Sequence, residues 1–463
     1  MNDLKNLKIT YIGGGSRGWA KNFMNDFALE PDLGGSVYLY DIDKQAAEYN
    51  AIIGNALTAR EDAVGKWNYV AEHDLAKALD GADFVVISIL PGTFDEMESD
   101  VHTPEKYGIY QSVGDTTGAG GLVRALRSVP IFYNYAKAIE KYCPNAWVIN
   151  FTNPMAMCVA GLYKGFPKIK AFGCCHEVFA TQTILGKVIK EQLGEDAERD
   201  DIRINVFGVN HFTWIDKASY KGKDLLPMYD KYIDAHPDGI GRDGNWANNG
   251  FQTKQLVKFE LFKRYGVIAA AGDRHLAEFC PADWYLSSPE RVEEMGFGLT
   301  TVAWRKQQEV YRVQQQAKRA TEGEPFKFFN SEEETVRQIK ALCGLHSFIT
   351  NVNVPNVGQI ANLPLGCVVE TNAQFSSDYV SPVFAGKIPP AINALVSRVA
   401  LNQEAIVEAA ITGDYELAFQ VFANDQGVQL PLNKARALFN EMLYNTRAYL
   451  PYYEQYAKKQ IKG

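Results

Sequence analysis

A glycine-rich turn between a strand and a helix is the feature that most constrains the fold of this chain. Residues 8–12 (KITYI) are apolar, and the glycines that follow have the spacing G-x-G-x-x-G before a predicted helix at 19–29. The first glycine permits a tight turn, the second lets a pyrophosphate approach the backbone, and the third allows close helix packing. The helix N-terminus then faces the phosphates. The residues predicted to bind a dinucleotide here are Gly13, Gly15, Ser16, Arg17 and Gly18.

The chain that follows decides between this interpretation and an ordinary glycine turn before a surface helix. Residues 37–40 form the next predicted strand, which ends at Asp41, where a carboxylate would hydrogen-bond a ribose diol. Further apolar runs alternate with predicted helices at 45–59, 73–79 and 121–142; the runs are 83–89, 147–151 and 171–173. Such runs are typical of parallel strands that are buried on both faces. The pattern predicts a doubly wound parallel α/β sheet, with ligands beyond the carboxyl ends of its strands.

The length of 463 residues exceeds one ordinary core, so we expect two closely packed domains. The predicted division gives a Rossmann-type domain at 1–195 and a C-terminal domain at 196–463 for substrate binding and oligomerisation. The second domain is predicted to be α+β and mostly helical, and residues 236–253 to be a loop or lid. Its predicted helices are 289–320, 332–343, 389–411, 414–423 and 432–457, with a more extended region at 345–378.

Charge and cysteine content exclude several function classes. The net charge of −8 argues against nucleic acid and anionic membrane surfaces as partners. We find no signal peptide and no apolar stretch long enough to span a bilayer. The seven cysteines are an odd number without the spacing of a disulfide scaffold, so a reducing cytoplasm is expected. The 12% aromatic content suits a sugar-binding surface, and equally suits large interfaces between domains or subunits.

The stretch 172–179 (FGCCHEVF) places two thiols, an imidazole and a carboxylate at the end of a predicted strand. His211 follows another predicted strand, at 202–209. A histidine at a strand end is more often structural, but Cys175 on a converging loop favours a metal site. A thiolate and an imidazole suit a divalent transition metal whose other positions stay open to substrate oxygens. Cys174 is expected to be a buried core residue.

Three other polar groups follow predicted elements. Asn153, in NFTNP, could offer its amide to ribose, nicotinamide or a sugar, although turn capping ahead of a proline is the alternative. Tyr265 lies at the end of an amphipathic helix predicted at 254–264, where Gly266 is a natural stop. Arg274 and His275 follow an apolar run at 267–271.

Taken together, these motifs resemble glycoside hydrolase family 4, the NAD- and manganese-dependent glycosidases, over almost the whole chain. The resemblance rests on GGGSRGW, VGDTTGAGG, NFTNPMAM, GCCHEVF, GVNHFTW, and YG after a helix. It implies a lactate/malate dehydrogenase-like fold and a redox route to hydrolysis. In that route NAD+ takes a hydride from C3 of the sugar, a base removes the acidified C2 proton, and the aglycone leaves C1. Water then adds, and NADH reduces C3 again; Mn2+ or another divalent ion stabilises the enolate-like charge.

The resemblance also implies roles for individual residues. Cys175 and His211 match the metal ligands, and Tyr265 matches the C2 base. Asn153 resembles a substrate or cofactor contact, and His275 is expected to contact the sugar. His176 stands where 6-phosphoglycosidases have Asn or Asp, which argues against a phosphorylated substrate; His176 and Asp115 are both candidates for the general acid.

The letters CHEV resemble the subgroup that acts on α-galacturonides rather than the CHS and CHG forms of neutral α-galactosidases and α-glucosidases. A C6 carboxylate should meet a cation, for which Arg274 is the candidate; a surface salt bridge is its alternative. An α-glucuronidase or a neutral α-galactosidase or α-glucosidase of the same family stays open. So do a plain 2-hydroxyacid dehydrogenase and a non-catalytic NAD sensor. A small-molecule uronide is the expected partner, in a homodimer or homotetramer.

Overall fold

The computed structural model describes residues 4–241, 253–299, 301–323 and 326–457. Most of the loop predicted at 236–253, namely residues 242–252, lies outside the described residues. Among the helices within these ranges, none is both long and apolar enough to cross a membrane.

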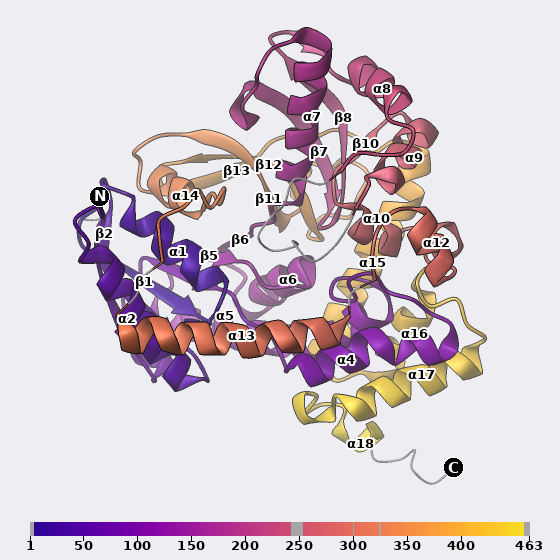
Figure 1. Ribbon diagram of the computed structural model, residues 1–463. Coiled ribbons are helices and arrows are strands. Elements are labelled where there is room, and N and C mark those ends of the chain that lie inside the picture. Colours follow the sequence, from indigo (N-terminus) through magenta and orange to yellow (C-terminus); the bar gives the residue numbers. More distant parts are fainter. Residues whose placement is uncertain (1–3, 242–252, 300, 324–325, 458–463) are drawn as a thin grey trace.

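A nine-stranded sheet forms the framework of the molecule, with the strand order β13-β12-β11-β6-β5-β4-β1-β2-β3 (Figure 1). Its six parallel strands are β1 Leu7–Ile12, β2 Gly34–Tyr40, β3 Lys66–Ala71, β4 Phe84–Ile87, β5 Trp147–Asn150 and β6 Lys170–Gly173. Three antiparallel strands extend it beyond β6: β11 Phe348–Pro355, β12 Val368–Ser376 and β13 Tyr379–Pro382. The parallel order reverses between β1 and β4, which is the switch point of a doubly wound sheet. The predicted Rossmann-type fold is confirmed.

Helices connect the parallel strands. Their bounds are α1 Trp19–Ala28, α2 Lys44–Thr58, α3 Leu75–Leu79, α4 Phe94–His102, α5 Gly118–Tyr142, α6 Met155–Gly165 and α7 Glu177–Leu193. Asp43 begins α2 by accepting the Ala46 N–H, and Thr93 and Glu96 form a capping box at the start of α4. The cap at Asp43 explains why the start of α2 could be predicted from sequence, whereas α4 and α6 were not predicted.

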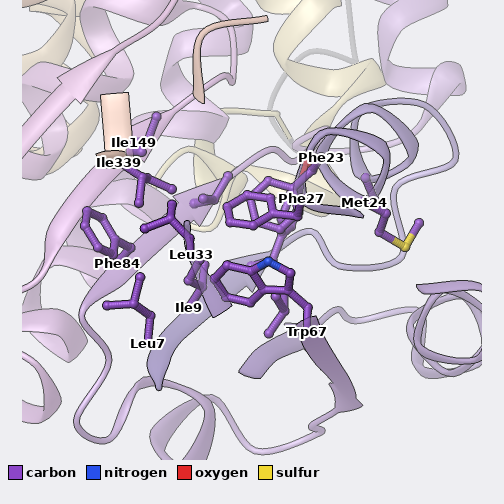
Figure 2. Packing of buried hydrophobic residues seen from close by; sticks show 14 of the residues in the cluster. Leu7, Ile9, Phe23, Met24, Phe27, Leu33, Trp67, Phe84, Ile149 and Ile339 are labelled. Atoms are coloured by element: carbon purple, nitrogen blue, oxygen red, sulfur yellow. The ribbon is translucent and has the colours of Figure 1, made fainter. Parts of the chain in front are cut away.

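The core beneath α1 is built from side chains of α1 and the first parallel strands (Figure 2). Leu7 and Ile9 of β1 lie beside Phe27 of α1, whose ring meets Trp67 of β3 edge-on at 4.4 Å between centroids. Each fully buried side chain of this size contributes about 1.5–3 kcal/mol to folding. Ile339, from far along the chain, joins the same cluster, so the C-terminal half packs directly onto the dinucleotide fold.

A second, antiparallel sheet follows α7 and carries His211 in a turn. It has the order β10-β8-β7, with β9 paired to β8. Its strands are β7 Ile202–Val209, β8 Phe212–Tyr220, β9 Lys223–Asp224 and β10 Ile268–Ala269. The helices beside it are α8 Leu226–Ala235, α9 Leu256–Tyr265, α10 Asp273–Phe279, α11 Ala282–Tyr285 and α12 Pro289–Glu294.

The remaining helices mostly pack on other helices, and α16–α18 lie at the lower right of Figure 1. They are α13 Val302–Glu322, α14 Thr335–Leu342, α15 Pro390–Thr412, α16 Tyr415–Asn424, α17 Leu432–Asn445 and α18 Glu454–Ala457. Helix α13 lies against α2 and α4, so it crosses the face where the glycine-rich turn opens. Its Gln316 side chain is buried and donates to the Gly15 carbonyl at 3.2 Å.

Several sequence-based expectations were wrong in detail. The single helix predicted at 289–320 is two helices, because the chain turns at Gly296, whose φ is +67°. The helix predicted at 432–457 ends at Asn445, and the strand β3 was not predicted. Strands β11–β13 join the same sheet as β1–β6, so this sheet includes strands from both sides of the predicted boundary at 195/196. That boundary stays a prediction.

Candidate active site

The glycine-rich turn has the conformation that a dinucleotide requires. Gly13 has φ +94°, and a Cβ atom there would lie 2.0 Å from the Ser88 carbonyl oxygen, so only glycine fits. Asp41, at the end of β2, accepts the Gly15 N–H through Oδ2 at 2.8 Å. Helix α1 begins after Gly18, which has no side chain to cap it; Ser16 Oγ accepts the Trp19 N–H at 3.1 Å, and the other N–H groups of the first turn suit an anionic group.

A cavity of about 280 Å³ opens beside this turn. It is lined by Ser16, Arg17 and Gly18 of the turn and by Arg312 and Arg319 of α13. Arg17 pairs with Asp43 at 2.7 Å and with Glu309 of α13 at 2.9 Å, which ties the turn to that helix. The turn, the helix N-terminus and the cationic wall fit a pyrophosphate and therefore fit NAD.

A second cavity, of about 230 Å³, lies where the carboxyl ends of the strands meet α13 and the second sheet. Seven of the residues predicted for catalysis, substrate binding or metal binding line it: Asp115, Asn153, Cys175, His176, His211, Arg274 and His275. Asn153 Oδ1 is buried there without a hydrogen-bond partner, as expected of a group that a ligand satisfies. The structure thus brings together residues that are up to 160 positions apart (Asp115 and His275).

Within the described ranges, one group of donors could hold a metal ion: Asp115, His211 and His275, whose ligand atoms all lie within 4.8 Å of one another. Asp115 lies in the loop before α5, and His275 lies in the first turn of α10. His211 occupies the turn between β7 and β8 with φ +63°. The rings of His211 and His275 are in contact, with centroids 3.7 Å apart and a tilt of 32° between their planes.

The protonation states of this group suit a cation. Burial, followed by the neighbouring His275, lowers the pKa of His211 to about 3, and burial also lowers the pKa of His275. Burial opposes ionisation of Asp115, but the charge of Arg124 and the hydrogen bond donated by Thr116 Oγ1 help to lower its pKa to about 2. Two neutral imidazoles and one carboxylate are ligands that divalent transition metals accept. An ionised Asp115 is no proton donor, which argues against the acid role suggested for it from sequence.

Neighbouring side chains hold both histidines in place. Thr116 Oγ1 lies 2.9 Å from His211 Nδ1, which directs Nε2 of that ring to the other side. Glu177 accepts the Gly272 N–H through Oε2 at 2.7 Å, and its Oε1 lies 3.8 Å from His275 Nε2. The Nδ1 atom of His275 is buried without a partner. A carboxylate behind a metal-ligating imidazole is the usual arrangement around protein metal sites.

Cys175 lines the same cavity but is not part of the three-donor group. Burial, together with the nearby carboxylates of Glu370 and Glu177, raises the pKa of its thiol well above the usual range, so it is neutral without a cation beside it. Cys174 is half-buried, whereas a buried residue was expected from the sequence; its Sγ atom donates to Gln338 Oε1 at 3.2 Å.

His176, at the start of α7, also lines the cavity. Its Nδ1 lies 4.0 Å from Glu333 Oε1, and its ring lies 6.0 Å from that of Trp19. Burial, followed by the charges of Asp26 and Glu334, raises the pKa of Glu333 to about 8. A protonated carboxyl beside an imidazole can supply a proton at neutral pH, which favours His176 over Asp115 as the acid.

The structure does not bring Tyr265 to this cavity. Its ring packs edge-on against Trp214 with centroids 5.7 Å apart, and Tyr265 is not among the described residues that line the cavity. Burial raises the pKa of its phenol, the opposite of what a base requires. His275 is instead the neutral, buried group beside His211.

Arginines from two helices, α10 and α13, add positive charge to the cavity wall. Arg274 is buried and donates to the Ser112 carbonyl at 2.5 Å and to the Gly298 carbonyl at 3.2 Å, so it is not the surface residue of the alternative interpretation. Helix α13 adds Arg305 and Arg312. Sequence reasoning predicted a helix here but missed its contribution to the cavity, because no motif marks it; the seven-residue spacing of its arginines was the available signal.

Comparison with known proteins gives the family. The Family 4 glycosyl hydrolase model matches residues 8–191, and the Family 4 glycosyl hydrolase C-terminal domain model matches residues 206–428. The α-galacturonidase of Thermoanaerobacterium saccharolyticum is 56% identical over 448 residues, which cover 96% of each chain.

Solved structures agree in fold. The crystal structure of lplD from Bacillus subtilis superposes with a TM-score of 0.90 at 48% identity, over 95% of this chain and 100% of that one. A 6-phospho-α-glucosidase from gut microorganisms, solved in complex with NAD and Mn2+, has a TM-score of 0.79 at 21% identity, over 96% and 99% of the two chains. The chain therefore belongs to glycoside hydrolase family 4.

Proposed function

We propose that this protein hydrolyses α-galacturonides with the help of NAD+ and a divalent metal ion, Mn2+ or another transition metal. The observation that carries the proposal is one cavity that holds a metal-competent group of donors and cationic side chains. This cavity lies next to a second one at a dinucleotide-binding turn. Relatives named α-galacturonidase, 48–56% identical over at least 95% of this chain, support the substrate class.

We propose that the two ligands occupy neighbouring cavities. The turn from Gly13 to Gly18 and Asp41 would hold the dinucleotide. His211 would hold the metal ion together with Cys175, and Asp115 and His275 are the further donors on the same wall. When bound, NAD+ accepts and returns a hydride, and the metal ion polarises a sugar oxygen.

The side chains of the cavity then divide the proton transfers. His176, with the protonated Glu333 behind it, is placed to donate a proton to the leaving oxygen. His275 Nδ1 is buried without a partner, so it can either bind the metal ion or, where Cys175, His211 and Asp115 hold that ion, accept a proton from the sugar. Tyr265 remains the base that the family resemblance predicts, and the two residues are separable by experiment. Asn153 offers an unpartnered amide oxygen to a hydroxyl.

The test is a panel of p-nitrophenyl glycosides assayed with NAD+, Mn2+ and a thiol reductant. It contains the α-galacturonide, α-glucuronide, α-galactoside and α-glucoside. We expect the α-galacturonide to have the highest kcat/KM, and we expect a chelator to abolish turnover. A higher kcat/KM for the α-glucuronide or a neutral glycoside would replace the proposed substrate.

Absorbance at the NADH band separates hydrolysis from simple oxidation. A glycosidase regenerates its cofactor, so p-nitrophenol should appear without net NADH. A stoichiometric and lasting rise in NADH would favour the 2-hydroxyacid dehydrogenase, and the absence of any turnover would favour the NAD sensor.

We also propose that the enzyme works in the cytoplasm as a homodimer or homotetramer. All seven cysteines are free, as expected in a reducing compartment. Light scattering coupled to size exclusion measures the oligomeric state, and a monomer at micromolar concentration would contradict it.

A further inference from the structure

One face of α13 carries a row of arginines. Arg305, Arg312 and Arg319 are spaced by seven residues, or two helical turns, so successive members lie about 10 Å apart along the same face. Arg312 and Arg319 line the cavity beside the glycine-rich turn, whereas Arg305 and Arg312 line the cavity that contains the group of metal donors. The row therefore runs from the dinucleotide end of the site to the sugar end, and Arg305 marks the sugar end.

We infer that Arg305 binds the C6 carboxylate of the substrate, with Arg274 behind it as a fixed second charge. The inference rests on the proposed function, since only a uronide carries this carboxylate. A guanidinium matches a carboxylate with two parallel N–H donors, and such a pair is strongest where water is excluded.

The surroundings of Arg305 favour an anionic ligand. Burial lowers the pKa of Arg305, and the neighbouring Arg124 and Arg312 lower it further, although Asp115 opposes them. A half-buried guanidinium group with other positive charges nearby is stabilised by an additional negative charge. A carboxylate arriving with the substrate supplies that charge.

The other two arginines of this cavity are less suited to the role. Arg274 donates to the carbonyls of Ser112 and Gly298, which fixes its guanidinium against the backbone. Arg312 borders both cavities, so its charge also faces the dinucleotide side. Arg305 combines exclusive placement at the sugar end with attachment to a helix that is tied to the glycine-rich turn through Glu309 and Arg17.

The inference is tested on the holoenzyme with R305Q, R305K and the matched control K318Q. Lys318 lies on the same helix, is exposed, and pairs with Glu322, so K318Q removes the same charge away from both cavities. The measurements are kcat/KM for the p-nitrophenyl α-galacturonide and α-galactoside. Calorimetry adds the Kd of D-galacturonate, of D-galactose and of NAD+. Binding of NAD+ also reports that each variant is folded.

We expect R305Q to lower kcat/KM for the galacturonide about 10- to 100-fold and to raise the Kd of D-galacturonate to a similar extent. In R305Q, kcat/KM for the galactoside and the Kd values of D-galactose and NAD+ should change less than about threefold. R305K should recover part of the loss in kcat/KM for the galacturonide, and K318Q should match the wild type. Equal losses on both sugars, or weakened NAD+ binding in R305Q, would overturn the inference. If the wild type itself turned over galactosides but no uronide, the proposed function would fail; if it hydrolysed galacturonides and R305Q did so equally well, only the inference would fail.

Discussion

Replacing Glu177 by glutamine should weaken binding of a divalent metal ion about ten- to a hundredfold and leave NAD+ binding unchanged. Glu177 begins α7, accepts the Gly272 N–H at 2.7 Å, and places its other oxygen 3.8 Å from His275 Nε2. Glutamine keeps an oxygen for the Gly272 N–H but removes the negative charge behind the imidazole.

The magnitude follows from the distance. Two full charges 3.8 Å apart interact by about 4 kcal/mol at an effective dielectric constant of about 20. The imidazole of a metal ligand carries only part of a unit charge, and the 3.8 Å separation exceeds a hydrogen bond. About 1.4–2.8 kcal/mol therefore remains, which corresponds to about ten- to a hundredfold in Kd.

Calorimetric titration of Mn2+ into E177Q, the wild type and E191Q measures this effect. Glu191 is the matched control, because it lies on the same helix and its Oε2 is 3.4 Å from His236 Nε2, but it does not line the cavity. An Mn2+ Kd in E177Q that equals the wild-type value, or an equal loss in E191Q, would refute the positioning role of Glu177.

Three further changes test the site and its electrostatics. C175S should weaken Mn2+ binding at least about tenfold and abolish metal-dependent turnover while NAD+ binding is retained, because a hydroxyl is a poor substitute for a thiolate ligand. Full activity of C175S would mean that Cys175 is not a metal ligand and that the other donors bind the ion. Tyr265 packs on Trp214 and does not line the cavity, so Y265F should leave C2 proton exchange with deuterated solvent unchanged if His275 is the base. Loss of this exchange in Y265F would show that Tyr265 is the base. Burial raises the pKa of Glu278 from 4.5 to about 8, so the folded state holds a proton that the unfolded state loses between these values. The wild-type free energy of unfolding should therefore fall with rising pH relative to E278Q, by up to about 1.4 kcal/mol per pH unit in that window, and parallel denaturation curves would contradict this pKa shift.

The dinucleotide fold could be predicted because its determinants are local. A strand, a glycine-rich turn and a helix follow one another within a few residues, and buried parallel strands are continuous apolar runs. The loops at the carboxyl ends of those strands must meet, so the strand order alone assigns Cys175 and Asn153 to one site, and both line the same cavity. The turn at Gly296 was not anticipated, because a glycine inside a helical pattern is compatible with either outcome.

The sequence by itself determined the α/β framework, the glycine-rich turn, and seven of the residues that line the cavity. Only the tertiary structure decided which of them touch: it brings the ring of His275 against that of His211, places Glu177 behind His275, and packs Tyr265 against Trp214. It also brings Arg305 of α13 to the sugar end of the site. The physical reason is that these contacts join elements far apart in the chain, and the charge states of their side chains depend on burial, which no local pattern encodes.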